Sequence, residues 1–332
     1  MPWRTPPAAR RLAVSTAAAA TLLVGLGTTG AAASQPASPA HGSLAGTFPG
    51  DPGRGRVVLG VAGTNISEHE QAGGKKLAHR LYFNKGISDF AVPAGPIARA
   101  ILAEQAAGRI PVVSEKTGIA ATATGRYDAQ LGAFFAWADA LPKTTFVIIH
   151  HEPENDAKGQ GASAQHQLAA DFRAAQQHVR AALDAATGGH PKHVSFGGSL
   201  MTYSLSKQGR AKFAPIDEFY PGPGVWDWVG WDHYNEAPSR PLEDPLWREA
   251  LATSARWKVR PAVTELGVRP EDRQGDAKLK AFYCDAIRLG LPFVLYFDSN
   301  ANSTGSGWTL AGRARTAWWA LVRTPRTATP NA

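Results

Sequence analysis

Short apolar runs alternate with longer amphipathic segments along most of this chain, and few folds accommodate that pattern. Several runs are almost uninterrupted in hydrophobic residues, such as FVII at 146–149, which is typical of parallel strands buried on both faces. The segments between them repeat apolar residues at helical spacing, as Phe172, Val179 and Leu183 do. The strand-type runs are 57–65, 79–85, 109–116, 145–152, 193–201, 228–234, 261–268 and 293–300.

The amphipathic segments supply the helices of the predicted fold. They occupy 94–107, 129–141, 165–186, 246–257, 277–289 and 314–322. The connections after the first and fifth runs contain no long segment of this kind. Strand–helix alternation repeated eight times predicts a single-domain (β/α)8 TIM barrel of the α/β class over residues 56–325. An open doubly wound sheet usually carries a glycine-rich phosphate-binding turn after its first strand, and GVAG at 60–63 does not match that motif.

The first 33 residues have the features of a secretory signal peptide. Arg4, Arg10 and Arg11 precede an uncharged, Ala-rich stretch, and small residues follow at 31–33. The uncharged run is also long enough for a membrane anchor, but its content of Ala, Thr and Gly favours a cleaved signal without stable membrane insertion. The adjacent Arg10 and Arg11 are compatible with the twin-arginine export route. We therefore expect a secreted, extracellular protein.

Composition sets the expected domain boundaries. Residues 34–55 are rich in Ser, Pro, Gly and Ala, which predicts a flexible tether before the barrel, and residues 326–332 are expected to form a disordered tail. The single cysteine, Cys284, excludes a disulfide within the chain. The barrel must therefore be stabilised by burial alone, and we expect it to be a monomer.

The net charge of +8 does not indicate a nucleic-acid partner. Three of the basic residues belong to the predicted signal. The others lie in short clusters, such as Lys75-Lys76, with acidic residues nearby, and no basic stripe with interleaved aromatic residues occurs.

Two glutamates end apolar runs at the edge where the active site of such a barrel lies. Glu152 ends the fourth run and Glu265 lies on the seventh, almost opposite it around a ring of eight strands. A charge in that position is costly unless it has a partner or a use. Glycoside hydrolysis uses such a pair: one carboxyl protonates the leaving oxygen and the other attacks the anomeric carbon.

The sixth run offers a partner for Glu265. Period-two alternation places Asp232 and Tyr234 on one face of that strand, so the Tyr234 hydroxyl can donate to Glu265 and orient it. Arg80 can act in the same way from the second run. Such donors are expected to lower the pKa of Glu265, whereas a carboxyl with fewer donors keeps its proton.

Polar and aromatic residues at other strand ends are candidates for substrate binding. Trp308 follows a Gly-containing loop and can stack on a sugar ring, although packing against the last helix is an equal alternative. The expected substrate-binding residues are Arg80, His151, Asn155, Asp232, Asp298 and Trp308.

Three alternatives remain for these charged residues. Glu154 has the same strand parity as Glu152 and could be the acid, although Pro153 lies before it. Glu265 could serve only in a structural ion pair. The histidines around Asp232, namely His150, His151 and His233, could bind a metal, but neighbouring strand residues point to opposite faces and the ligand spacing is absent. We therefore expect no metal and no cofactor.

Four segments resemble glycoside hydrolase family 26. IHHE at 149–152 resembles the end of that family's fourth strand, and DWVGWDHY at 227–234 resembles its sixth. PAVTELG at 261–267 is similar to its nucleophile strand, and LYFD at 295–298 to its eighth strand. The family belongs to a clan of retaining (β/α)8 glycosidases, and its best-known members are secreted endo-β-mannanases.

The resemblance implies a role for each matching residue. Glu152 would be the acid/base, Glu265 the nucleophile, Tyr234 the residue that orients it, and His151 a supporting group. The chain departs from the family after Glu152, where PEND at 153–156 replaces a Met-Asn-Gly sequence that shapes the sugar subsites.

The sequence therefore predicts a secreted retaining glycoside hydrolase that acts on a polysaccharide or oligosaccharide. The alternatives are a non-catalytic carbohydrate-binding barrel and a metal-dependent hydrolase or lyase. The motifs leave open which sugar and linkage are cleaved, and whether cleavage is endo or exo.

Overall fold

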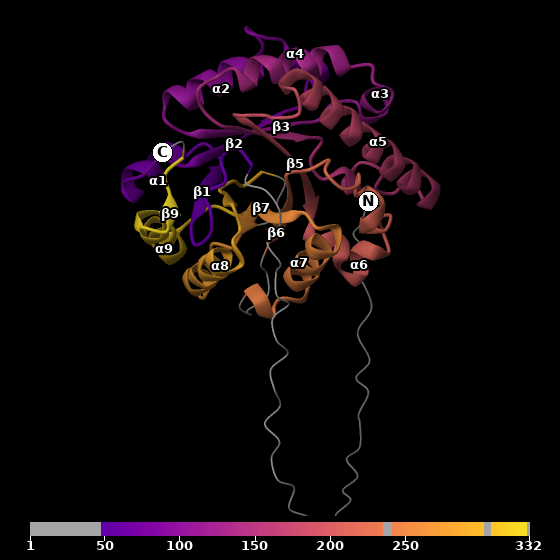
Figure 1. The fold of residues 1–332 in the computed structure, drawn as a ribbon. Helices are drawn as coiled ribbons and strands as arrows, with labels where there is room; N and C mark the ends of the chain where they lie inside the picture. The colour runs from indigo at the N-terminus through magenta and orange to yellow at the C-terminus, as the bar shows by residue number, and fades with distance from the viewer. Residues whose placement is uncertain (1–47, 235–240, 302–306, 331–332) are drawn as a thin grey trace, which may run out of the picture. The chain divides into compact units, whose positions relative to one another are not determined.

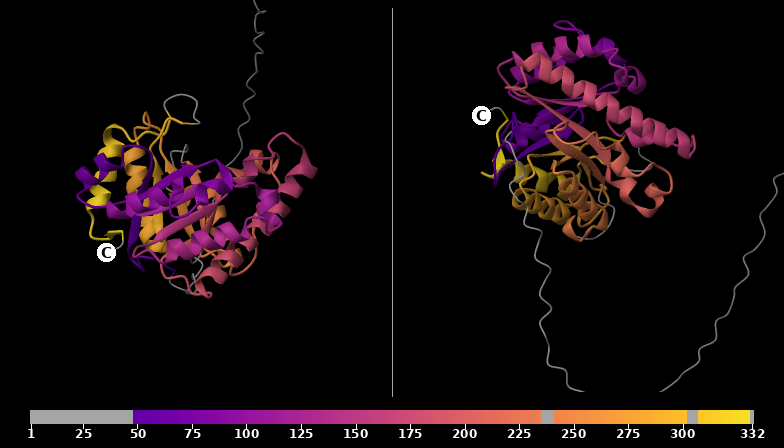
Figure 2. Two further views of the ribbon diagram at one scale, coloured as in Figure 1. Left: turned by 90° about the horizontal axis from the view of Figure 1, so that it is seen from above. Right: turned by 45° about the vertical axis from the view of Figure 1, so that its right-hand side comes forward.

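Eight parallel strands close into a barrel with helices on its outer side (Figures 1 and 2). The structure is a computed structural model and describes residues 48–234, 241–301 and 307–330. Neighbouring strands follow the chain order, and pairing of the first strand with both the second and the eighth closes the ring. The strands are β1 (Val57–Ala62), β2 (Ala78–Phe83), β3 (Ile110–Glu115), β4 (Thr145–Ile149), β5 (Val194–Met201), β6 (Trp228–Tyr234), β7 (Arg260–Gly267) and β8 (Phe293–Phe297).

Helices connect the strands and cover the barrel, which confirms the predicted (β/α)8 fold. The α-helices are α1 (Ile66–Gly73), α2 (Pro96–Ala106), α3 (Ile119–Ala123), α4 (Asp128–Asp139), α5 (Ala162–Thr187), α6 (Lys207–Arg210), α7 (Pro245–Trp257), α8 (Gly275–Leu289) and α9 (Gly312–Arg323). The short 3-10 helices are η1 (Gly86–Phe90), η2 (Pro153–Asn155), η3 (Thr202–Leu205), η4 (Ile216–Phe219) and η5 (Pro241–Glu243). As expected, the connections after β1 and β5 contain only short helices, the longest being α1 with 8 residues.

The interior of the barrel has an apolar lower half and a polar upper half. Phe146, Trp228 and Phe293 meet in the lower half, with the Trp228 and Phe293 rings 4.8 Å apart and nearly perpendicular. Toward the carboxyl ends of the strands, alternate positions become polar, beginning with Arg80 on β2 and Ser199 on β5. The apolar half therefore forms a floor, and the polar half forms the base of the functional site.

The folded unit extends beyond the predicted boundaries at both ends. Phe48 is buried with its ring edge against Phe146, and Asp51 pairs with Arg260, so residues 48–55 belong to the barrel and not to a tether. At the other end, β9 (Thr327–Ala328) pairs with β1 and is buried, which corrects the expectation of a disordered tail from residue 326.

The predicted signal peptide at 1–33 and the rest of the predicted tether lie outside the described residues. No helix in the described part of the chain has the length and apolar character needed to cross a membrane.

Candidate active site

A cavity of about 620 Å³ opens at the carboxyl ends of the barrel strands. It lies where sequence patterning places the site, because the ends of parallel strands meet at one rim of the barrel. Six predicted site residues line the cavity: His151, Glu152, Asn155, Tyr234, Glu265 and Trp308. Three others, Arg80, Asp232 and Asp298, do not.

Glu265 reaches the cavity through an irregularity in β7. The pairing between β6 and β7 shifts by one residue, so that Trp231 lies opposite Val263 but Asp232 lies opposite Glu265. The extra residue, Thr264, also directs its side chain into the barrel, where its hydroxyl accepts from Ser199 at 3.1 Å. A bulge of this kind re-aims the following side chain, and here it turns Glu265 inward beside Thr264.

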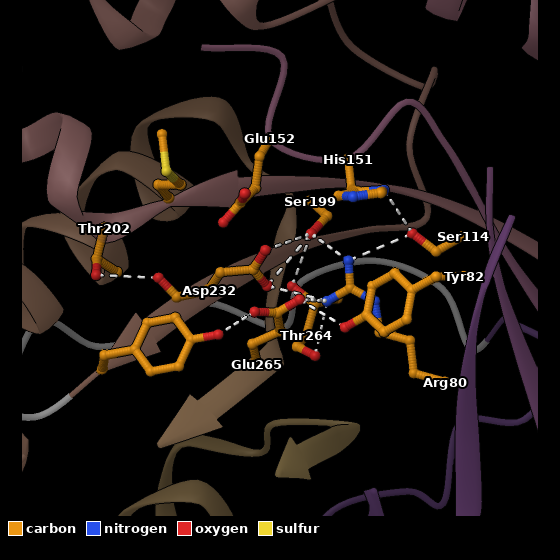
Figure 3. Close-up of polar contacts among 12 residues, drawn as sticks. Arg80, Tyr82, Ser114, His151, Glu152, Ser199, Thr202, Asp232, Thr264 and Glu265 are labelled. Atoms are coloured by element: carbon orange, nitrogen blue, oxygen red, sulfur yellow. Dashed lines mark hydrogen bonds and ion pairs between the residues drawn. The ribbon is translucent and has the colours of Figure 1, made fainter. Parts of the chain in front are cut away.

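Three donors hold the Glu265 carboxylate (Figure 3). The Tyr82 hydroxyl donates to Oε1 at 2.6 Å, and the Tyr234 hydroxyl donates to Oε2. The Arg80 guanidinium lies 3.0 Å from Oε1. The expected contacts of Tyr234 and Arg80 with Glu265 are therefore both present in the structure.

Arg80 lies beneath the cavity, with no exposed side-chain surface. Its Nη1 donates to the Thr264 carbonyl oxygen at 2.9 Å and to Asp232 Oδ1 at 3.2 Å. Asp232 is 2% exposed and also accepts from Ser199. The expectation that Arg80 and Asp232 bind substrate is therefore corrected: both are covered by other side chains and act on Glu265 from below.

Asp298 is also buried and lies away from the cavity. Its carboxylate accepts from His69 Nε2 at 2.8 Å and from the Leu310 backbone N–H at 2.7 Å. The expected substrate contact of Asp298 is corrected by these bonds, which tie the segment after β8 to α1.

Glu152 is placed differently from Glu265, because β4 ends before it, at Ile149. The prediction that this strand continues to residue 152 is wrong. His150 and Glu152 both adopt left-handed backbone conformations, with φ of 65° and 47°, and the Glu152 N–H donates to the Ser199 carbonyl oxygen at 2.9 Å. Among the residues that the structure describes, one donor reaches its carboxylate: the Asn155 side-chain amide, at 3.3 Å.

The two glutamates approach each other closely. One carboxylate oxygen each from Glu152, Asp232 and Glu265 lies within 4.8 Å of the others, and Figure 3 shows the three side chains converging, Glu152 from the segment after β4 and the other two from β6 and β7. Such oxygens are also of the type that binds divalent cations. Arg80 pairs with Asp232 and Glu265 and so supplies a positive charge to two of the three carboxylates.

The electrostatic environment distinguishes the two glutamates. Burial, together with the charges of Asp232 and Glu265, raises the pKa of Glu152 well above its usual range. Burial and the neighbouring Asp232 raise the pKa of Glu265 to about 7, although Arg80 and the two tyrosines act in the opposite direction. The expected lowering for Glu265 is therefore outweighed by burial, but the order stands: Glu152 keeps its proton to a higher pH than Glu265.

His151 lines the cavity and contacts Ser114. Its Nδ1 lies 2.9 Å from the Ser114 hydroxyl oxygen, which itself accepts from Arg80 at 3.4 Å. The Ser114 hydroxyl therefore links His151 to the buried guanidinium. Burial and the nearby Arg80 charge lower the pKa of His151 well below its usual range, so it remains neutral.

The other acid and histidine candidates point away from the cavity. His150 bonds to the Thr117 carbonyl oxygen and to Asp156, and His233 packs between Trp247 and Phe282 behind the barrel. These two histidines therefore do not converge with Asp232 on a shared metal site.

Glu154 is completely buried and does not line the cavity. Its Oε1 accepts from the Met201 N–H at 2.8 Å and from the Ser204 hydroxyl at 3.1 Å. This glutamate therefore fastens the end of β5 to the segment after β4, and the geometry favours Glu152 over Glu154 as the acid.

Sequence reasoning missed Tyr82, which lines the cavity and contacts Glu265 directly. A signal was available, because Arg80 and Tyr82 are two residues apart in one strand and therefore share a face. Trp308 lies at the cavity with its ring centroid 4.4 Å from that of Tyr234 and 3.8 Å from the Arg269 guanidinium carbon. Its stacking on a sugar stays a prediction.

Comparison with known proteins gives a likeness of fold. No family model and no curated protein matches the sequence. A Cellulomonas fimi endo-β-1,4-mannanase double mutant is similar with a TM-score of 0.56 and 14% identity, covering 84% of this chain and 74% of that one. A family 26 β-mannanase from Bacteroides ovatus gives 0.55 and 12%, covering 84% and 92%, and Bacillus subtilis mannanase BCman gives 0.54 and 12%, covering 85% and 93%. At these identities the comparison establishes the barrel fold, and the predicted likeness to family 26 is confirmed at that level.

Proposed function

We propose that this protein is a secreted retaining glycoside hydrolase that cleaves a polysaccharide or oligosaccharide by double displacement. The observation that carries the proposal is the approach of Glu152 and Glu265, whose nearest carboxylate oxygens lie within 4.8 Å at the cleft. Retaining enzymes separate the two carboxyl groups by about 5–5.5 Å, whereas inverting enzymes need about 6.5–9.5 Å to admit a water molecule. The short separation favours a covalent intermediate over direct attack by water.

In the first step, a Glu265 oxygen attacks the anomeric carbon while Glu152 donates its proton to the departing glycosidic oxygen. The old C–O bond breaks as the new ester bond forms, and the leaving group departs as an alcohol. The pKa order supports this assignment, because the reaction needs Glu265 ionised and Glu152 protonated at the same pH.

In the second step, the Glu152 carboxylate removes a proton from water, and the water oxygen attacks the same carbon. The ester bond to Glu265 breaks, and the sugar is released with its original anomeric configuration. Glu152 is protonated again and Glu265 is ionised again, so both groups return to their starting states.

The residues around the pair have supporting roles. Arg80 and Tyr234 keep Glu265 in a fixed orientation from below and from β6. His151 lies at the cavity wall, where its imidazole can form a hydrogen bond with a sugar hydroxyl. Trp308 offers an aromatic ring for the apolar face of a sugar, and Asn155 holds Glu152.

The neighbouring structures make β-mannan the first substrate to test, because all three are named as mannanases. The PEND sequence at 153–156 departs from the family pattern in the segment that carries Glu152. Such segments determine substrate specificity, so the substrates tested must include glycans other than mannan. The predicted export of the chain is consistent with a polysaccharide substrate outside the cell. We expect the enzyme to act there as a monomer.

The experiment is a screen of the purified protein on β-mannan, xylan, β-glucans and their oligosaccharides, with NMR detection of the first-formed anomer. The proposal expects a product with retained configuration, and no product from Glu265→Gln protein that folds like the wild type. A product of inverted configuration would overturn the role of Glu265. Binding of a glycan without turnover would favour the non-catalytic carbohydrate-binding barrel.

A further inference from the structure

Glu265 receives a tyrosine hydroxyl on each of its two carboxylate oxygens. Tyr234 on β6 donates to Oε2, and Tyr82 on β2 donates to Oε1 at 2.6 Å. The strands that carry these tyrosines lie on different sides of β7 around the ring. The carboxylate is therefore gripped from two directions and cannot rotate about its last bond without breaking a charge-assisted hydrogen bond.

The Tyr82 ring is itself fixed by its surroundings. The Arg80 guanidinium carbon lies 4.8 Å from the ring centroid, in cation–π contact. His151 and Phe297 pack against it at centroid distances of 5.5 Å and 6.5 Å with nearly perpendicular planes. These contacts leave the hydroxyl with one direction, toward Glu265, as Figure 3 shows.

Tyr82 differs from Tyr234 in its exposure. Both tyrosines line the cavity, but Tyr82 is 41% exposed, whereas Tyr234 is half-buried against Phe297 and Trp308. A sugar that reaches Glu265 must therefore be accommodated beside the Tyr82 ring. The same side chain that orients the carboxylate also forms a wall of the space where the sugar must lie.

We propose that Tyr82 is a positioning residue for Glu265, holding Oε1 from β2 while Tyr234 holds Oε2 from β6. The inference rests on the proposed function for its catalytic meaning. Its chemistry is that of a permanent donor. Although the ring is exposed to the cavity, desolvation of the hydroxyl where it meets Glu265, together with the Glu265 charge, keeps the Tyr82 pKa well above the ordinary range despite Arg80 nearby. A phenol that keeps its proton stabilises the ionised form of Glu265 throughout the working pH range.

The test compares Tyr82→Phe with the wild type and with Tyr203→Phe. Tyr203 is a matched control, since its side chain is 40% exposed and its hydroxyl contacts Lys212 outside the cavity lining. The first measurement is a 13C NMR titration of protein labelled at the glutamate carboxyl carbon, in which the resonance missing from Glu265→Gln protein identifies Glu265. This measurement needs no substrate.

Tyr82→Phe removes one charge-assisted donor, so the titration midpoint of Glu265 should rise by about one pH unit, with no change in Tyr203→Phe. A 3-fluorotyrosine placed at position 82 keeps the ring and strengthens the donor, so the midpoint should fall. On a cleaved substrate, kcat of Tyr82→Phe should drop at least about tenfold, since a charged hydrogen bond is lost at the reacting group.

An unchanged Glu265 midpoint in both Tyr82 variants would overturn the inference, whatever substrate the protein uses. A shifted midpoint with kcat equal to that of the wild type would also overturn it, because the bond would then have no bearing on the reaction. A shifted midpoint in a protein that cleaves none of the glycans would leave the Tyr82 contact standing and refute the proposed function.

Discussion

The two sides of the cleft treat their glutamates in opposite ways. Glu265 lies within β7, is turned inward by a bulge and is held by Arg80, Tyr82 and Tyr234. Glu152 lies beyond the end of β4 in a left-handed backbone conformation, and within the described part of the chain one donor, the Asn155 amide at 3.3 Å, reaches its carboxylate. Two chemically identical side chains can therefore differ in protonation, because different numbers of hydrogen-bond donors surround them.

Charge explains why this asymmetry matters. Asp232 lies beside the pair, so three carboxylates gather near the buried guanidinium of Arg80, which pairs with Asp232 and Glu265. They cannot all be ionised cheaply in a buried site, and the group with fewest donors keeps its proton. On this account the donor-rich side supplies the nucleophile and the donor-poor side supplies the acid.

The largest expected effects come from replacing the two glutamates themselves. Glu265→Gln should lower kcat at least about 10³-fold on every substrate, because no other group can form the intermediate. Glu152→Gln should abolish cleavage of a glycan but keep formation of the intermediate from a dinitrophenyl glycoside, whose leaving group needs no proton. Steady-state and burst kinetics on both substrate types check this, and equal losses for the two variants on the dinitrophenyl glycoside would remove the division of roles.

The next largest effect concerns the shared cation. Arg80→Met leaves Asp232 and Glu265 buried without a positive partner, which should destabilise the protein by about 3–5 kcal/mol. Arg256→Met is the control, since Arg256 pairs with Asp217 on the surface and should matter by at most about 1 kcal/mol. Urea unfolding of both variants measures the difference, and similar values for the two would show that Arg80 does not stabilise the carboxylate cluster.

A smaller effect comes from Glu154, the buried carboxyl behind Glu152. Burial raises its pKa from an ordinary 4.5 to about 7, so the folded state binds this proton more tightly than the unfolded state. Its contribution to stability is complete below about pH 4.5 and is lost as the pH rises toward about 7, by up to roughly 3 kcal/mol.

Glu154→Gln carries no titrating proton and should make unfolding less dependent on pH over this range. Unfolding free energies at pH 5 and pH 8 check this, with exposed Glu68→Gln as the matched control. The variant should also retain activity, because Glu154 lies outside the cavity. If the pH dependence of Glu154→Gln matches that of the wild type, Glu154 is not the buried acid described above.

The smallest expected effect concerns the hydrogen bond from Asn155 to Glu152. Asn155→Ala removes the donor to Glu152 and with it some stabilisation of the ionised form, so the pKa of Glu152 should rise slightly. The alkaline limb of the kcat/KM profile should move up by a few tenths of a pH unit with a change in rate of a fewfold at most. A shift of the acidic limb instead would mean that Asn155 acts on the pKa of Glu265 and not on that of Glu152.

Much of the fold was readable from the sequence because parallel barrel strands are buried on both faces. The apolar runs at 146–149 and 293–297 are visible as such, and the amphipathic helix at 165–186 has the spacing of one long helix. The ends were less predictable. Phe48 packs against Phe146, and the short strand β9 pairs with β1. These contacts join residues far apart in the chain, so no local sequence pattern predicts them.

The sequence predicts which candidate residues lie near strand ends, but it does not predict which of them are buried beneath other side chains. Glu152, Glu265 and Tyr234 were identified because they lie at or near the ends of apolar runs. Asp298 also lies near the end of its run and Arg80 lies within the second run, yet both are covered by neighbouring side chains. Burial at a strand end follows from packing between distant strands, which a single sequence does not reveal.

Backbone irregularity accounts for the remaining differences. The bulge at Thr264 directs two consecutive side chains inward, against the period-two rule. The left-handed conformation of Glu152 follows the end of β4, so its direction is unrelated to strand parity. Tyr82 obeys the rule and shares a face with Arg80, but its contact with Glu265 depends on the closed ring.

The site of the covalent intermediate tests the division of roles most directly. A 2-deoxy-2-fluoro glycoside of the cleaved sugar, with dinitrophenolate as leaving group, lets the intermediate accumulate for mass spectrometry of the digested protein. We predict one added sugar on the peptide that contains Glu265, in both wild-type and Glu152→Gln protein. A label on Glu152, or an inverted product with no label at all, would contradict the account.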